Sequence, residues 1–211
     1  ELVSLMVSQL SSGSVHASVA KRDAALKTLG RLASNTSHVA NPYLQYPRLL
    51  GALVKILKTE QAAPVRRETI RVLGILGALD PYRHKLLEST MDPVVTAGGS
   101  QTDLFELATL IGTSTDEYYQ NVAIEALIAI LRDPTLSVHH HAVIEAIMYM
   151  FKTQGLKCVA FLPQIVPAFL GVIRTCAGGG LSEFYYQQLA ILITIIKQHV
   201  RNYLRDIFAL V

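Results

Sequence analysis

The sequence predicts an all-α protein, an α-solenoid of stacked antiparallel helix pairs with one irregular insertion. Three observations indicate this architecture: apolar residues recur at spacings of three and four, alternating β patterns are nearly absent, and the helix pairs recur along the chain. The composition agrees, because 51% hydrophobic and 17% charged residues supply ample surface to bury and exclude a disordered chain. The 211 residues suit one solenoid segment, and we expect it to be a fragment of a larger chain.

The apolar spacing locates each helix pair in turn. In the second pair, Leu49, Leu53 and Ile56 share one face of the first helix, and Leu73 and Leu76 share one face of the second. Connectors containing Gly, Pro or Ser separate the helices. We expect hairpins at about 1–35, 45–86, 117–154 and 158–199, a final helix at 200–211, and an irregular insertion at 87–116.

The second helices of the pairs recur at a regular interval. Val19 and Val65 lie 46 positions apart, and Val138 and Leu181 lie 43 apart, which fits the period of about 40–47 residues typical of HEAT repeats. The interval between Val65 and Val138 is longer by about thirty residues, the length of the insertion. The sequence therefore predicts about four to five HEAT-type antiparallel helix pairs, with the insertion projecting as a loop from one face.

The second repeat also resembles the HEAT pattern in its residues, with Pro47 near the first helix, Val65-Arg66 opening the second and Leu-Gly-x-Leu inside it. In such repeats an acidic residue six positions before the Arg pairs with it along the stack. Glu60 and Arg66 have this spacing, as do Asp133 and His139, with His in place of Arg. We expect these residues to form inter-repeat pairs.

Signals for chemistry are mostly missing from the sequence. No apolar run reaches the length of a membrane span, and neither kinase motifs nor a nucleophile elbow is present, so we expect no transmembrane segment and no catalytic, cofactor-binding or metal site in this chain. Adjacent residues of the run His139-His140-His141 point about 100° apart on a helix and cannot converge on one metal ion. Packing is the favoured role, with pH sensing and metal binding as alternatives. Cys158 and Cys176 are expected to be unpaired structural thiols.

Charge is distributed unevenly along the chain. Residues 45–85 contain eight basic and three acidic residues, whereas residues 86–131 contain seven acidic residues and no Lys or Arg. The basic residues are not interleaved with aromatic ones in the manner of a nucleic-acid interface, so we expect protein partners and no nucleic acid. The candidate partner surface consists of Arg48, Lys55, Arg67 and Arg71.

Several runs resemble the HEAT region of the target of rapamycin (TOR) serine/threonine kinases, which belong to the phosphatidylinositol-3-kinase-related kinases. These runs are Tyr46-Pro47-Arg48-Leu49-Leu50, Val65-Arg66-Arg67-Glu68, His139-His140-His141 and Gly155-Leu156-Lys157-Cys158-Val159. The resemblance covers about residues 40–211 apart from the insertion.

The resemblance implies a non-catalytic scaffold segment that mediates protein–protein interaction and complex assembly in nutrient and growth signalling. The implied parent is a kinase whose catalytic domain lies outside this chain and uses ATP and Mg²⁺. The implied partners are Raptor-type or Rictor-type subunits and a second TOR chain. The implied location is cytoplasmic, and also peripheral at vacuolar or lysosomal membranes. The alternative from the repeat pattern alone is an independent HEAT scaffold of the importin or phosphatase-subunit type.

Overall fold

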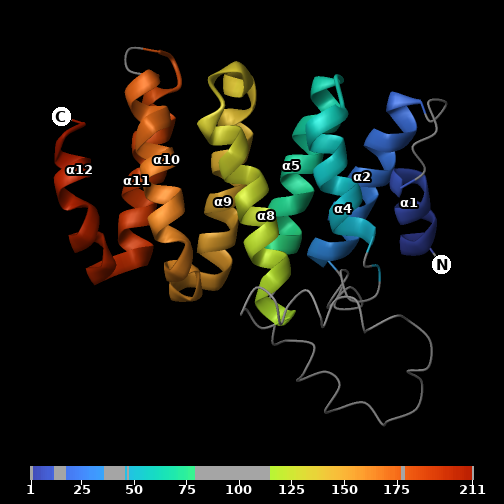
Figure 1. Cartoon of the computed structure of the whole chain (residues 1–211), viewed down its shortest axis with the longest axis horizontal. Helices are drawn as coiled ribbons and strands as arrows, with labels where there is room; N and C mark the ends of the chain where they lie inside the picture. The colour runs from blue at the N-terminus through green and yellow to red at the C-terminus, as the bar shows by residue number, and fades with distance from the viewer. Residues whose placement is uncertain are drawn as a thin grey trace, which may run out of the picture.

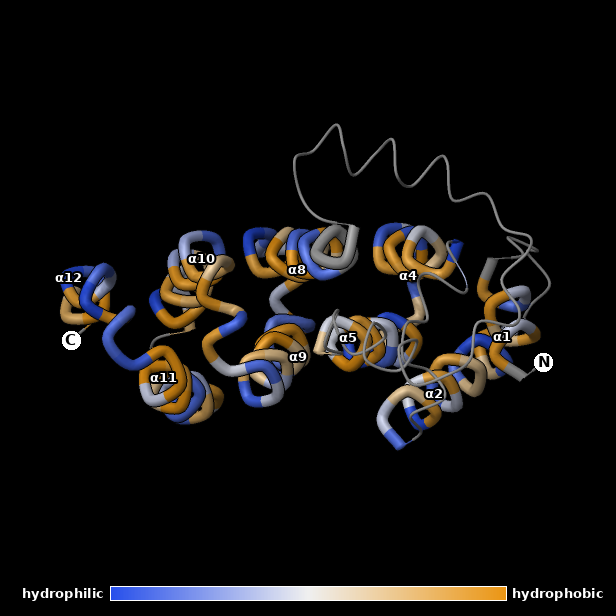
Figure 2. The backbone as a smooth tube through the Cα atoms, turned by 90° about the horizontal axis from the view of Figure 1, so that it is seen from below, coloured by the Kyte–Doolittle hydropathy of each residue, from blue (hydrophilic) through white to orange (hydrophobic). Residues whose placement is uncertain are grey.

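The helices stack side by side in two layers. The computed structural model describes residues 2–11, 18–35, 46, 48–78, 115–176 and 179–210. Helices α4, α8, α10 and α12 lie in one layer, with α1 next to α4, and α2, α5, α9 and α11 form the other (Figures 1 and 2). Apolar residues lie where the two layers face each other (Figure 2). No strand occurs among these residues. The predicted all-α solenoid is confirmed for this part of the chain.

The first two helix pairs are α1 (Leu2–Ser11) with α2 (Val19–Asn35) and α4 (Arg48–Thr59) with α5 (Ala63–Gly77). The later pairs are α8 (Thr115–Arg132) with α9 (Ser137–Gln154) and α10 (Leu162–Thr175) with α11 (Ser182–Ile196), before the short α12 (Leu204–Phe208). In the described part of the chain, three 3₁₀ helices connect them: η1 (Pro134–Leu136), η2 (Gly155–Phe161) and η3 (Lys197–Tyr203). Of the predicted insertion, Thr115 and Asp116 begin α8, and residues 87–114 lie outside the described residues.

Two segments expected to be α-helical begin instead as 3₁₀ helices. Cys158 was expected at the start of a helix, but it lies in η2, and α10 begins at Leu162 with Pro163 in its first turn. Proline fits a first turn because the N–H that it lacks has no partner there. At the other site Lys197 ends α11 with a positive φ of 51°. The 3₁₀ helix η3 then covers residues 200–203 of the range expected to be the final helix, and α12 begins only at Leu204.

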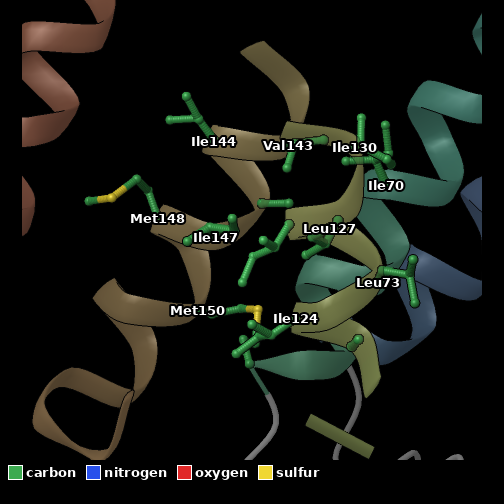
Figure 3. Close-up of a cluster of buried hydrophobic side chains, with 14 of the residues drawn as sticks. Ile70, Leu73, Ile124, Leu127, Ile130, Val143, Ile144, Ile147, Met148 and Met150 are labelled. Atoms are coloured by element: carbon green, nitrogen blue, oxygen red, sulfur yellow. The ribbon is translucent and has the colours of Figure 1, made fainter. Parts of the chain in front are cut away.

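The core is a continuous apolar interface between the layers. Leu73 of α5, Leu127 of α8 and Ile144 of α9 are almost completely buried, and their side chains lie in one cluster (Figure 3). The helical spacing of apolar residues also predicts core positions at Val65, Leu73, Leu76, Ile144, Ile147, Leu189 and Ile193. All of these are buried except Ile193, which is half-buried. Each buried Leu or Ile stabilises the fold by about 1.5–3 kcal/mol through removal from water.

Glycine allows neighbouring second helices to approach closely. A Cβ atom built on Gly74 of α5 would lie 2.7 Å from the Cβ and 2.8 Å from the Cα of Ala146 in α9. A Cβ on Gly30 of α2 would lie 2.8 Å from Nη2 of Arg71 in α5. Gly30 and Gly74 each belong to a Leu-Gly-x-Leu motif, Leu29-Gly30-Arg31-Leu32 and Leu73-Gly74-Ile75-Leu76. Both motifs therefore place their glycines where one second helix meets the next.

One long apolar stretch lies within this stack. Among the described residues, Pro134–Thr175 contains an 18-residue window with a mean hydropathy of 1.9, long and apolar enough by composition to cross a membrane. That range comprises η1, α9, η2 and α10, and 56% of the window is buried inside the protein. Such burial is typical of core helices, and composition alone is weak evidence for a membrane span.

Candidate protein-interaction site

Glu60 links two consecutive repeats at the connector between α4 and α5. Its Oε2 atom lies 2.7 Å from Nη2 of Arg22 in α2, and its Oε1 atom accepts a 3.0 Å hydrogen bond from the Ala62 amide. Arg66, the expected partner of Glu60, donates instead to the Glu60 main-chain carbonyl at 2.6 Å. The carboxylate thus binds the preceding repeat, and the carbonyl binds the following helix.

These contacts govern the ionisation of Glu60. Burial raises the pKa of its carboxyl group, but the hydrogen bond from Ala62 and the hydrogen bond and charge of Arg22 outweigh burial and hold the pKa below the usual value. Arg22 was not predicted, because its partner lies in another repeat and a search for a fixed six-residue spacing does not detect it. The signal available in the sequence was its place in the first turn of a second helix, as for Arg66.

The Asp133 contact differs from the expected pair with His139. Asp133 caps η1, since its Oδ1 atom accepts hydrogen bonds from Thr135 N at 2.9 Å and Thr135 Oγ1 at 2.6 Å. These bonds hold the pKa of Asp133 below its usual value. It is His140 that reaches the Asp133 carbonyl, at 3.1 Å, and the Ile130 carbonyl, at 3.0 Å. Because carbonyl oxygens only accept, Nε2 of His140 carries the proton and caps the end of α8.

The three histidines occupy three different environments. His139 is 6% exposed, and its Nδ1 atom is buried with no hydrogen-bond partner among the described residues. Burial lowers the pKa of His139, and the charges of Arg66 and Arg67 lower it further. His141 stacks on Phe184 of α11, with ring centroids 4.1 Å apart. Within the described ranges, no group of three His, Cys, Asp or Glu side chains is arranged to hold a metal ion.

The four residues of the candidate partner surface lie in different layers. Arg48 and Lys55 are exposed on α4, whereas Arg67 and Arg71 are exposed on α5. Figure 2 shows that α4 and α5 lie in different layers. Arg71 donates from Nε to Oε1 of Glu68 at 2.8 Å, and its guanidinium lies beside Gly30 of α2. The four residues therefore form two separate basic surfaces, and the one on α5 continues onto α2.

Two glutamine side chains join three helices at the end of α5. The Gly77 carbonyl at the end of α5 accepts from Nε2 of Gln120 in α8, at 3.2 Å, and from Nε2 of Gln154 in α9, at 2.9 Å. Both hydrogen bonds supply partners to a carbonyl that has none within its own helix. The helices before and after the insertion are thus bonded directly to each other, which keeps the stack continuous.

Known proteins resemble this chain over most of its length. Residues 39–197 match the family described as the serine/threonine-protein kinase mTOR domain. The chain is 48% identical over 193 residues to serine/threonine-protein kinase TOR2 of Saccharomyces cerevisiae, and 47% identical over 202 residues to serine/threonine-protein kinase mTor of Drosophila melanogaster. It is 38% identical over 222 residues to serine/threonine-protein kinase TOR of Oryza sativa.

The similarity involves a small part of each relative. The matches cover 90% of this chain for the yeast and fly proteins and 100% for the rice protein. They cover 8%, 8% and 9% of the respective relatives. The chain therefore spans less than a tenth of the length of the curated relatives named above.

Proposed function

Because the chain belongs to the family of TOR serine/threonine-protein kinases, we propose that it is a non-catalytic scaffold segment of such a kinase. In this role it mediates protein–protein interaction and complex assembly in nutrient and growth signalling. The observation that carries the proposal is the continuous two-layer stack, in which each second helix packs on the next and leaves long outer faces open (Figure 2). Solenoids of this kind present extended binding surfaces.

The proposed partners are Raptor-type or Rictor-type subunits and a second TOR chain. The proposed location is the cytoplasm, with peripheral association at vacuolar or lysosomal membranes. ATP and Mg²⁺ belong in this proposal to a catalytic domain outside the chain. The relatives named above are TOR kinases rather than importin-like or phosphatase-subunit proteins, so no observation favours the alternative scaffold.

The proposal is tested in the full-length kinase by disturbing the stack at one contact. Gly74→Leu places a side chain where Ala146 already lies, whereas Gly51→Leu on α4 adds one where no atom lies within 4 Å. We expect Gly74→Leu to reduce co-precipitation of Raptor-type or Rictor-type subunits and to leave phosphorylation of a short substrate peptide intact. Gly51→Leu should preserve both properties. Loss of peptide phosphorylation with unchanged subunit capture would contradict a scaffold role.

A further inference from the structure

The layer formed by α2, α5, α9 and α11 is basic at one end and nearly uncharged at the other. Helices α2 and α5 together contain seven Lys and Arg residues and two acidic residues. Helices α9 and α11 together contain one Lys and two Glu. The outer face of this layer therefore combines two chemically different halves.

The basic half is centred on the seam between α2 and α5. Gly30 lets the guanidinium of Arg71 lie against α2, and Arg31 follows Gly30 in the sequence of that helix. Arg67 lies one turn before Arg71 on the same helix, and Arg31 and Arg67 are both exposed. Lys27 and Arg71 have carboxylate partners in Asp23 and Glu68. Neither Arg31 nor Arg67 forms an ion pair within the described residues.

The other half exposes aromatic side chains. Tyr149 of α9 and Tyr186 of α11 are each 43% exposed. Between these helices, the stacked rings of His141 and Phe184 are half-buried. Partly exposed tyrosines combine a large apolar ring with a polar tip, and they are enriched at protein–protein interfaces.

We propose that the outer face of this layer binds an extended polypeptide segment that carries acidic side chains followed by an apolar anchor. The acidic part lies over α2 and α5, where Arg31 and Arg67 provide charges with no carboxylate partner. The apolar anchor lies beside Tyr149 and Tyr186. This inference rests on the proposed scaffold function and names the chemistry of the partner.

The arrangement favours a polypeptide over nucleic acid or a lipid surface. Helices α2 and α5 contain no aromatic residue on which bases could stack. A membrane-binding face requires large apolar side chains interleaved with the basic ones, whereas here the two kinds occupy different helices.

The spacing of the helices sets the length of the segment. Packed helices lie about 8–10 Å apart, so α5 and α11, which are separated by α9, are about 20 Å apart. An extended chain advances about 3.3 Å per residue, so about six residues span this distance. A suitable probe is a fluorescein-labelled peptide with a glutamate run, a spacer of about six Ser and Thr residues, and a Leu-Phe anchor.

The experiment measures binding of this peptide to the full-length protein by fluorescence anisotropy. We expect Arg31→Glu/Arg67→Glu to weaken binding by about tenfold or more. The matched control Lys58→Glu/Arg132→Glu reverses two exposed charges in the other layer, changes the net charge equally and should change affinity by less than about twofold. Tyr149→Ser/Tyr186→Ser should weaken binding of the anchored peptide and leave a peptide without the Leu-Phe anchor unaffected.

Four results would overturn the inference. The first is an equal loss of peptide affinity in the two charge-reversed proteins, and the second is unchanged affinity in the protein with the tyrosine substitutions. The third is unchanged affinity when the glutamates of the peptide are replaced by glutamine. The fourth is tighter binding of a thymidine oligonucleotide or of phosphatidylserine vesicles than of the peptide. The same variants are also assayed for co-precipitation of Raptor-type and Rictor-type subunits. If the unaltered protein captures the subunits but does not bind the peptide, only this inference is wrong. If the unaltered protein captures no subunit, the proposed scaffold function is wrong.

Discussion

Nη2 of Arg22 lies 2.7 Å from the Glu60 carboxylate, and this ion pair fastens the second helix of one repeat to the connector of the next. The side chains are 22% and 10% exposed, so the pair is largely shielded from water. Glu60 also accepts from Arg66 through its carbonyl. One residue therefore holds two arginines, each from a different repeat.

Arg22→Leu should destabilise the chain, because the largely shielded carboxylate of Glu60 then loses its cation. We expect a loss of about 1–3 kcal/mol in the free energy of unfolding, measured by urea denaturation of the 211-residue chain at pH 7. Arg67→Leu is the control, since Arg67 is exposed and makes no ion pair in the described part of the chain. Equal losses for the two variants would show that the Glu60 contact contributes little.

The same contact predicts a dependence of stability on pH. The pKa of Glu60 is held below its ordinary value of 4.5 in the folded chain, so the unfolded chain binds the proton more readily. The resulting stability is present above that value and is lost as the pH falls through the lower folded pKa. Glu60→Gln should therefore show a smaller loss of stability on acidification than the unaltered chain. Parallel acid-unfolding curves for the two proteins would refute this.

Replacement by alanine should lower the stability of the chain at Gly74 and raise it at Gly51. The new methyl group of Gly74→Ala would meet the Cβ and Cα of Ala146 at 2.7 and 2.8 Å, and one of those atoms belongs to the backbone. We expect destabilisation of about 1–3 kcal/mol from overpacking. Gly51→Ala has open space and should stabilise α4 by up to about 1 kcal/mol through higher helix propensity. Thermal unfolding of both variants checks the opposite signs.

The sequence predicted the helices well because their signal is local. Leu49, Leu53 and Ile56 are spaced four and three residues apart, and this spacing alone specifies a helix face without reference to the rest of the chain. The start of α10 was missed because apolar periodicity does not distinguish the 3₁₀ turns around Cys158 from an α-helix.

The contacts between repeats were predicted less well, for a geometric reason. The six-residue spacing of Glu60 and Arg66 lies within one repeat and can be seen in the sequence. Arg22 belongs to the preceding repeat, and it contacts Glu60 only because the two repeats are stacked. Arg48 and Arg67 are close in sequence, yet they lie on different layers because the helix pair turns between them (Figure 2). Which outer face a residue occupies depends on packing that no single helix encodes.

His139 should make the chain sensitive to mild acid. Burial and the charges of Arg66 and Arg67 lower its pKa below 6.5 in the folded state, so protonation favours unfolding. Stability should be complete above the unfolded pKa of about 6.5 and fall as the pH decreases toward the folded value. His139→Gln removes the titration and should flatten this part of the curve. The free energy of urea unfolding at several pH values provides the measurement, and His141→Gln at a partly exposed position provides the control.

The two cysteines should differ strongly in reactivity. Burial raises the pKa of the Cys158 thiol to about 11, and its side chain is fully buried. The reactive thiolate is therefore nearly absent at pH 8, and reagents have no access to it. Cys176 is also free but only half-buried, at the end of α10. Titration with a thiol reagent at pH 8 should modify Cys176 first and Cys158 only at the rate of unfolding. Cys176→Ser should then leave a chain that reacts only when urea is added, and rapid labelling of that variant in the absence of urea would show that Cys158 is accessible.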